Sequence, residues 1–395
     1  MEEPFAYLPG NSGRDGRAMG MHQTGGDARV KLFLRTDDCN VGDAYGYFKL
    51  THLMRDALIA EGVQVTANTG DSFDIALHIS GADYWRHVEG KKNVLFTMME
   101  TTGLPEYWRG YMEKASMVVV PCEHNKPLYQ ERFNGPVEVC QLGTSPEEFP
   151  YFERKAPSAG EPFRFLWVGG PSARKGQYQA VIAFTRWLRQ GTIPPNAQLY
   201  LKSTDFGRTG ITKYRVGVDH EAGNHPWAVD FLPVHGLPKN TPDRPEIIHD
   251  FRNLSTEQLN GLYQSAHAFL LPSIGEGWGL TLTEAMSTGL PCVWTHWSAP
   301  VDYADATIGY PLPVKVARFF VSNGQYGADG KWQSWVDWER AGGIVDPQDI
   351  IGAMQEIYDD YPRALELGKA ASERMHSRYT WRHAAQRLIK ILEGV

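Results

Sequence analysis

Short apolar runs and amphipathic helical patterns alternate along the chain in two successive series. The first series opens with the strand-like run VKLFLR at 30–35 and a helical pattern at 44–62. Further strand-like runs follow at 74–80, 93–98, 116–121 and 137–143. Helical patterns lie between the later runs, at 105–115 and 124–133. Strands that alternate with helices predict βαβ units and a mostly parallel sheet.

The second series starts with the strand-like run FRFLWVGG at 163–170, followed by a helical pattern at 177–191 and a strand at 197–203. The stretch 203–245 is irregular and too long for a plain connection. After it come EIIHDF, a helix, the strand HAFLLP, a second helix and the strand PCVWT, at 246–251, 255–266, 267–272, 280–288 and 291–295. Ser255 and Gln258 have the spacing of a capping box, which predicts the helix start. Three helical patterns end the chain, at 349–362, 363–376 and 380–394.

The two series predict two doubly wound α/β domains of Rossmann type that face each other across a cleft. The charged, proline-rich stretch from 144 to 162 has no period and is typical of a linker. We therefore predict a mobile N-terminal extension, a first Rossmann-like domain, a linker, a second Rossmann-like domain and a final helix that returns toward the first domain, at 1–28, 29–145, 146–162, 163–375 and 376–395. Ligands of such folds bind at the carboxyl ends of the strands, which places the expected site in the cleft.

Composition narrows the function classes only moderately. Hydrophobic residues make up 42% and charged residues 22% of the 395 residues, as in soluble globular proteins. The net charge of −7 does not indicate a nucleic-acid-binding protein, although a local basic patch remains possible. Twelve Trp and eighteen Tyr suit carbohydrate or base stacking, and equally suit a large core.

The cysteines and the lengths of the apolar runs bear on compartment. No apolar run approaches the roughly 20 residues of a membrane helix, so we expect no integral membrane segment. The four cysteines are scattered without metal-ligand spacing, which fits a reducing compartment: Cys39, Cys122, Cys140 and Cys292. A cytoplasmic protein is expected, with peripheral association at a membrane left open.

Two glutamates mark the segment LPSIGEGWGLTLTEAMSTGLP at 271–291, with seven residues between them. Glu276 follows a strand in a glycine-rich loop, and Glu284 lies on the helix that begins near Leu280. A helix N-terminus attracts anions such as a diphosphate, and Gly277 and Gly279 let a ligand approach the backbone. The two carboxylates could accept hydrogen bonds from sugar hydroxyls and a ribose diol. On spacing alone, the pair also fits a helix cap and a solvated side chain.

A second candidate site lies in WVGGPSARKGQYQAVIAF at 167–184, where Arg174 and Lys175 precede a helix. Two cations at a helix N-terminus oppose the helix dipole unless an anion such as a polyphosphate binds between them. The segment is not a P-loop, because the G-x-x-x-x-G-K-[ST] spacing is absent. A solvated basic turn is the alternative.

Together with WSAPVDY at 297–303, these segments resemble the C-terminal domain of retaining glycosyltransferases of the GT-B fold, specifically glycosyltransferase family 4. The resemblance rests on the glutamate–seven–glutamate motif, with EGWG at its first acid, EAM at its second and GLP after it, and covers about 160–310. It implies GT-B architecture and transfer of a hexose from a UDP- or GDP-sugar. It also implies that no cofactor and no bound metal are needed, the nucleotide-diphosphate sugar being a co-substrate.

The resemblance also implies roles for residues of the second domain. Lys175, with Arg174 as helper, would neutralise the donor diphosphate, and Glu276 would hold the donor sugar near its reacting face. Glu284 would hold the ribose. The backbone that would hold sugar and phosphate comprises Gly277, Trp278, Gly279 and Leu280.

One position departs from the family pattern. The family commonly has an arginine directly after VG, where this chain has Gly170. Arg174 or Lys202 would then supply the missing charge, so these residues are also donor-side candidates.

The first domain supplies the acceptor-side candidates. RTDDCNVGDAYGYFKLTHLM at 35–54 resembles the family's glycine-rich first loop, in which Gly42 and Gly46 would approach donor and acceptor closely. Asp43 and Tyr45 are candidates for acceptor contact, although an aspartate in a loop commonly just forms a turn. The segment FTMMETTGLPEYW resembles one of related enzymes and places Glu100 near the cleft.

The sequence leaves the acceptor open. A glycan, a lipid-linked or a small-molecule hydroxyl is expected, and a nucleic-acid base is the first alternative. That alternative rests on DYWRHVEGKK and EYWRG, in which aromatic residues alternate with cations that could hold a strand. The second alternative is a binding module that has lost its chemistry.

Overall fold

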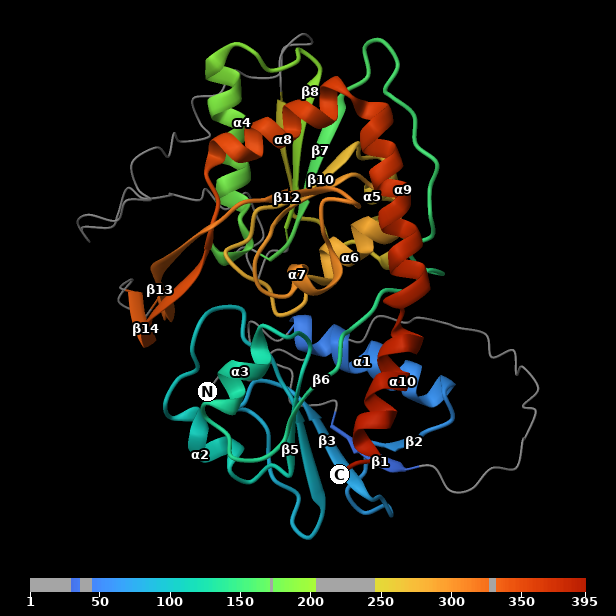
Figure 1. The fold of residues 1–395 in the computed structure, drawn as a ribbon, viewed down its shortest axis with the longest axis vertical. Helices are drawn as coiled ribbons and strands as arrows, with labels where there is room; N and C mark the ends of the chain where they lie inside the picture. Colours follow the sequence, from blue (N-terminus) through green and yellow to red (C-terminus); the bar gives the residue numbers. More distant parts are fainter. Residues whose placement is uncertain (1–29, 36–44, 171–172, 204–245, 327–331) are drawn as a thin grey trace, which may run out of the picture.

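The computed structural model describes residues 30–35, 45–170, 173–203, 246–326 and 332–395. Two α/β domains lie one above the other along the long axis, each built on a parallel sheet (Figure 1). The candidates Gly42 and Asp43, the N-terminal extension, Cys39 and most of the irregular stretch lie outside the described residues. No helix in the described ranges is long and apolar enough to span a membrane.

The N-terminal domain is a six-stranded parallel sheet in the order β2-β1-β3-β4-β5-β6. Its strands are β1 (Lys31–Leu34), β2 (Gln64–Thr66), β3 (Ile75–Ile79), β4 (Lys92–Phe96), β5 (Met117–Val120) and β6 (Val137–Val139). Its helices are α1 (Tyr45–Ala60), α2 (Trp108–Met112) and α3 (Asn125–Gln130). Strand β2 was not predicted, because its three residues lie at the sheet edge, are not fully buried and carry little apolar signal.

The C-terminal domain has a second six-stranded parallel sheet, in the order β12-β11-β10-β7-β8-β9. Its strands are β7 (Phe163–Val168), β8 (Ala197–Lys202), β9 (Glu246–Asp250), β10 (Ala268–Leu271), β11 (Cys292–Thr295) and β12 (Tyr310–Leu312). Its helices are the 3₁₀ turn η2 (Ala173–Lys175), α4 (Gln177–Gln190), α5 (Thr256–Gln264), α6 (Leu280–Ser287), α7 (Pro300–Tyr303) and α8 (Pro347–Asp359). The predicted capping box at Ser255 and Gln258 is confirmed. This is the Rossmann strand order. Strands β7, β8 and β9 extend toward one edge of the sheet and β10, β11 and β12 toward the other, so the strand order reverses between β7 and β10.

A long antiparallel hairpin was not predicted at all. Strands β13 (Lys315–Tyr326) and β14 (Trp332–Ile344) form it between β12 and α8. The base of the hairpin reaches the N-terminal domain, where the Thr102 amide donates to the Ala341 carbonyl and the Ala341 amide donates to the Thr102 hydroxyl, both at 3.0 Å. Figure 1 shows the hairpin beside the level at which the domains meet.

Two long helices at the end of the chain connect the domains. Helix α9 (Tyr361–Arg378) packs on α6, where a Cβ at Gly368 would lie 2.3 Å from the Gly289 carbonyl oxygen, so only glycine allows this approach. Helix α10 (Trp381–Leu392) lies against α1 of the N-terminal domain (Figure 1). A backbone bridge joins Thr144 to Thr380, so the two segments that cross between the domains lie side by side.

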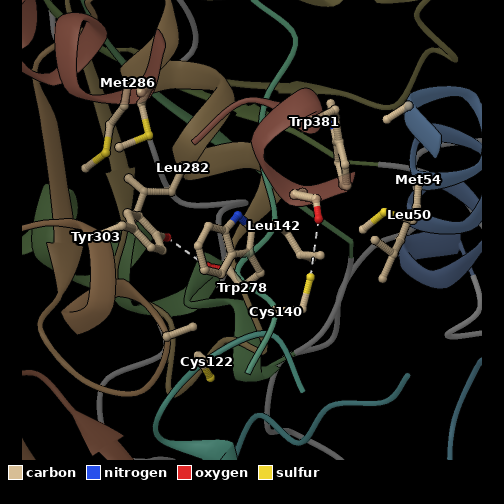
Figure 2. Close-up of a cluster of buried hydrophobic side chains, with 14 of the residues drawn as sticks. Leu50, Met54, Cys122, Cys140, Leu142, Trp278, Leu282, Met286, Tyr303 and Trp381 are labelled. Carbon is tan, nitrogen blue, oxygen red and sulfur yellow. Dashed lines mark hydrogen bonds between the residues drawn. The ribbon is translucent and has the colours of Figure 1, made fainter. Parts of the chain in front are cut away.

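One buried hydrophobic cluster extends through both domains and this crossing. It includes Leu50 of α1, Leu142 of the crossing segment, Trp381 of α10 and Trp278 of the glycine loop (Figure 2). Cys122, Cys140 and Cys292 are buried and unpaired, as expected for small apolar side chains. Burial raises the pKa of the Cys140 thiol to about 12.

Arg154 fastens the linker to the C-terminal domain. Its buried guanidinium donates to the carbonyls of Thr288 and Tyr263 and to the Thr288 hydroxyl, near the ends of α6 and α5. No carboxylate takes part in these described contacts, and burial lowers the pKa of Arg154 to about 10. A cation at the C-terminal ends of two helices is favoured by their dipoles.

Replacing Arg154 by methionine should therefore lower the free energy of unfolding by about 3 kcal/mol, because it leaves buried carbonyls without a donor. The measurement is the midpoint of urea denaturation. Arg363→Met is the control, since Arg363 forms an exposed pair with Glu366 on α9 and should cost less than about 0.5 kcal/mol. Equal losses in the two variants would show that Arg154 does not anchor the linker.

Candidate functional site

The two candidate segments of the second domain meet beside β7 and β10, where the strand order of the sheet reverses. Strand β7 leads toward η2, which carries Arg174 and Lys175, and the neighbouring strand β10 leads into the glycine loop and α6. In open parallel sheets, ligands bind outside the carboxyl ends of the strands at this point. The topology therefore places Arg174, Lys175 and Glu276 at one site.

Glu276 is the buried centre of this cluster. The Lys175 ammonium lies 2.6 Å from Glu276 Oε2, and Arg174 Nη1 lies 3.7 Å from the same oxygen. The Glu276 side chain is 3% exposed, whereas Lys175 is 28% exposed. Lys175 is thus the counter-ion of a buried carboxylate, not only a solvated cation of a basic turn. Oxygen Oε1 of Glu276 is buried without a hydrogen-bond partner among the described residues, which leaves it able to accept from a ligand.

A glycine and a tryptophan bring the Lys175 turn to this position. Gly176 has φ +77°, and a Cβ there would lie 2.2 Å from the Pro272 carbonyl oxygen at the end of β10. The turn can approach the end of β10 this closely only because Gly176 has no side chain. The indole of Trp167 on β7 donates a hydrogen bond to the Lys175 carbonyl at 3.0 Å, which ties the turn to β7.

Two residues of the WSAPVDY segment hold the glycine loop. Ser298 has φ +58°, an uncommon conformation for a residue other than glycine. Its hydroxyl accepts a hydrogen bond from the Glu276 amide at 2.9 Å. The Tyr303 hydroxyl donates to the Trp278 carbonyl at 2.8 Å, shown as a dashed line in Figure 2. The Trp278 indole packs in the core against the Tyr303 ring, so only the backbone of Trp278 can serve a ligand. Neither Ser298 nor Tyr303 was among the predicted site residues.

Glu284 lies on α6 with both carboxylate oxygens engaged. The Tyr263 hydroxyl of α5 donates to Oε2 at 3.0 Å, and the Lys49 ammonium lies 2.5 Å from Oε1. Lys49 belongs to α1 of the opposite domain, 235 positions away in the sequence. Neither Tyr263 nor Lys49 was among the predicted site residues.

The segment after β4 completes the site from the N-terminal domain. Glu100 Oε1 lies 3.0 Å from Arg174 Nη2, so this acceptor-side candidate is an ion-pair partner of a donor-side candidate. The amide of Met98 donates to the Tyr47 hydroxyl of α1 at 3.1 Å, which positions the segment. A Cβ at Gly275 would lie only 1.8 Å from the Glu100 carbonyl oxygen. The glycine loop of one domain therefore lies directly against the other domain.

The remaining candidates lie apart from these ion pairs. Gly46 lies in the first turn of α1 and Gly170 just after β7, each with open space where a Cβ would stand. Tyr45 begins α1, and only its backbone is described. The Lys202 ammonium donates to the carbonyls of Ser203 and Asp250 at the ends of β8 and β9, and burial lowers its pKa. In the ranges that the structure describes, no three His, Cys, Asp or Glu side chains are grouped to hold a metal ion.

Comparison with known proteins bears on this part of the chain. Residues 248–388 match the model of a family described as Family 4 Glycosyltransferase in conflict systems. The matched region contains the glycine loop, α6 and both glutamates. The C-terminal domain is GT4-like.

Curated proteins match about a third of the chain, and one of them is named a glycosyltransferase. The D-inositol 3-phosphate glycosyltransferase of Corynebacterium aurimucosum is 29% identical over 135 residues, which are 34% of this chain and 25% of that protein. The sucrose synthase of Nitrosomonas europaea is 24% identical over 147 residues, which are 35% of this chain and 14% of that protein. The chain thus spans a quarter or less of the length of these relatives.

Solved structures resemble nearly the whole chain. Sucrose-phosphate synthase from Thermosynechococcus elongatus has a TM-score of 0.59 at 16% identity, covering 93% of this chain and 99% of that one. The Anabaena protein Alr3699/HepE, in complex with UDP and glucose, has a TM-score of 0.59 at 12% identity, covering 93% and 100%. These similarities confirm the predicted GT-B fold.

The close approach at Gly275 gives a test of how the domains meet. Gly275→Ala should force the glycine loop away from the Glu100 carbonyl and separate the domains, because the added Cβ has no room. Small-angle X-ray scattering should then show a larger radius of gyration. Gly110→Ala on α2 is the control, since a Cβ there meets nothing within 4 Å. An unchanged radius for Gly275→Ala would contradict the direct contact.

Proposed function

We propose that this chain is a glycosyltransferase that moves a hexose from a UDP- or GDP-sugar to a hydroxyl acceptor, with retention and without a bound metal. The observation that carries the proposal is the buried Glu276 carboxylate. It lies beside two cations, and its Oε1 has no hydrogen-bond partner in the part of the chain that the structure describes. The GT4-like domain and the similarity to a D-inositol 3-phosphate glycosyltransferase support the reaction class. The HepE complex with UDP and glucose supports the choice of donor class.

Donor binding would use the chain's own charges. The diphosphate would lie between the N-terminus of α6 and the cations of Arg174 and Lys175, where the helix dipole and both side chains attract an anion. These groups would stabilise the charge that grows on the leaving diphosphate. Glu284 would accept hydrogen bonds from the ribose hydroxyls. Glu276 would accept a hydrogen bond from a hydroxyl of the donor sugar through Oε1.

The transfer itself would occur on one face of the sugar. The acceptor oxygen would form the new bond to the anomeric carbon on the side from which the diphosphate leaves, and the acceptor proton would pass to the leaving phosphate oxygen. Glu276 would orient the reacting carbon and would not itself become glycosylated. Isolation of a covalent glycosyl-Glu276 intermediate would contradict this route.

A nucleic-acid acceptor remains the second candidate, and exposed tyrosines favour it. Tyr84 and Tyr107, in the segments DYWRHVEGKK and EYWRG, are 58% and 48% exposed, and Tyr111 on α2 is 46% exposed. Trp85 and Trp108 of the same segments are buried in the core, so only part of the aromatic pattern is accessible for stacking.

A thermal-shift screen of nucleoside diphosphates and their sugars tests the proposal most directly. A ligand at 100 times its dissociation constant stabilises the folded protein by about 2.7 kcal/mol. UDP or GDP should raise the melting temperature, and the matching sugar should be hydrolysed or transferred. No shift with any nucleotide would refute donor binding, whereas a shift without turnover would favour the binding module.

Glu276→Ala should lower kcat by at least about 100-fold, because it removes the group that orients the reacting carbon. Affinity for the nucleoside diphosphate should persist, since the ribose and phosphate contacts are elsewhere. Calorimetry and turnover assays measure the two effects, and Glu276→Gln serves as the isosteric companion. Turnover like that of the wild type in both variants would show that Glu276 does not orient the donor sugar.

Glu284→Gln should raise the donor KM more than it lowers kcat, because a ribose contact is made equally in the ground and transition states. Steady-state kinetics with varied donor separate the two constants. Tyr263→Phe is the companion variant, as it removes one hydrogen bond to Glu284 and keeps the carboxylate, so its effect should be smaller. A collapse of kcat alone would rule out the ribose assignment.

A further inference from the structure

The hairpin of β13 and β14 forms a sheet of its own. Among the residues that the structure describes, neither strand pairs with a third strand, so each strand presents an outer edge. A two-stranded hairpin has little stability by itself, and its outer edges offer backbone groups to which another chain can bind. Figure 1 shows the hairpin beside the boundary between the two domains.

Backbone contacts fix the direction in which the outer edge of β14 points. The Gly343 amide donates to the Ile274 carbonyl of the glycine loop at 2.8 Å. The Ala341 amide and carbonyl bond the Thr102 hydroxyl and amide, both at 3.0 Å. Ile274 lies two residues before Glu276 in the chain. The base of this edge therefore contacts both domains beside the candidate site.

The same edge continues from Ala341 toward the tip of the hairpin. Outward amides and carbonyls recur at every second residue of an antiparallel strand, which places Glu339 and Asp337 next on this edge. Beyond Val336 the register shifts at a bulge, which interrupts the regular pattern. The regular stretch is 336–340, with a length of about 17 Å at about 3.4 Å per residue. It can pair with a short extended segment.

The chemistry of this edge favours an extended polypeptide as its partner. The donors and acceptors alternate with a spacing that another peptide backbone repeats, as in strand addition. Asp337 and Glu339 at the outward positions disfavour a polyanion such as a nucleic acid. A second copy paired antiparallel over this stretch would set the acids of the two chains against one another, whereas basic residues would form opposite-charge pairs.

We propose that the outer edge of β14 binds an extended segment of a polypeptide, and that this polypeptide is the acceptor of the proposed reaction. The segment adds to the hairpin as a third strand and continues the backbone contacts that Thr102 makes at Ala341. Thr102 lies two residues after Glu100, whose carboxylate pairs with Arg174 of the candidate site. A serine or threonine at that end of the segment is the group that is glycosylated. Its oxygen forms the bond to the anomeric carbon, the bond to the diphosphate breaks, and its proton passes to the leaving phosphate oxygen.

Fluorescence anisotropy with labelled peptides tests the docking without any donor, so this part does not depend on the proposed function. The probe is the capped peptide STKVKVTS, which has two lysines on one face and hydroxyls at both ends, whichever way the strand runs. The same sequence with N-methyl groups on two adjacent central amides has lost a donor toward each edge. It should bind at least about tenfold more weakly. A peptide with glutamate in place of both lysines should also bind more weakly.

Proline variants locate the edge that binds the peptide. Glu339→Pro removes an outward amide of β14 and leaves the hydrogen bonds within the hairpin intact. It should weaken binding about tenfold, as expected for one lost hydrogen bond. Ser322→Pro is the matched control, since it removes an outward amide from the opposite edge, on β13, and should leave the affinity unchanged. Glu339→Gln keeps the amide and should only reduce the preference for the lysine peptide.

Several results would overturn docking on this edge. One is the absence of binding of any of the peptides to the wild type. Another is equal binding of the unmodified and N-methylated peptides, a comparison that holds even if Glu339→Pro fails to fold. Equal affinities of Glu339→Pro and Ser322→Pro would contradict the choice of edge. Tighter binding of single-stranded DNA, or a dimer in sedimentation that Glu339→Pro abolishes, would contradict the choice of a polypeptide.

The role as acceptor rests on the proposed function and has its own readout. With a UDP- or GDP-sugar, the wild type should add a hexose to the peptide, which mass spectrometry detects and localises to one end. Binding of UDP or GDP without transfer to the docked peptide would refute the acceptor role alone. If the wild type binds neither nucleotide, the proposed function fails, and the anisotropy result for the hairpin stands independently of it.

Discussion

A buried carboxylate has to be paired, and the pairing of Glu276 shapes the whole site. Burial of an ion without a partner costs several kcal/mol, so Glu276, at 3% exposure, depends on the Lys175 ammonium beside it. This requirement accounts for the position of the Lys175 turn and for the glycine at 176 that lets the turn approach β10. It also accounts for two cations at the start of α4, where the helix dipole alone would disfavour them.

The topology of the C-terminal sheet explains why Lys175 and Glu276 meet at all. They lie 101 positions apart, yet β7 and β10 are neighbours at the point where the strand order reverses. The loops that follow these two strands therefore converge, and the Ile274 amide of one donates to the Arg174 carbonyl of the other at 2.7 Å. The GT4-like match covers the second of these loops and α6, whereas β7 and the Lys175 turn lie before it.

Local pattern was enough to predict the two parallel sheets and the central helices, because buried strands such as β5 and β10 are continuous apolar runs. The β13–β14 hairpin was not predicted, because polar and charged residues interrupt its apolar positions, as in VKVARFFVSNGQY at 314–326. The motif also led to both glutamates. Their partners were missed for different reasons: Lys49 approaches from another domain, and the positive φ of Ser298 is not encoded in the identity of a serine. Contacts between distant segments and backbone conformations imposed by packing are not visible in a single sequence.

The double crossing between the domains limits how they can move. The backbone bridge of Thr144 to Thr380 ties the two crossing segments together, and a Cβ at Gly143 would lie 2.2 Å from the Thr380 backbone. Sliding of one domain past the other would break this bridge, whereas a swing about it would not. Helix α9 moves with the C-terminal domain and α10 with the N-terminal domain, so the torsion of such a swing falls on the short junction at Tyr379. The crossing therefore acts as a hinge. The angle between the two domains depends on the backbone torsion angles of a few residues that lie away from the candidate site.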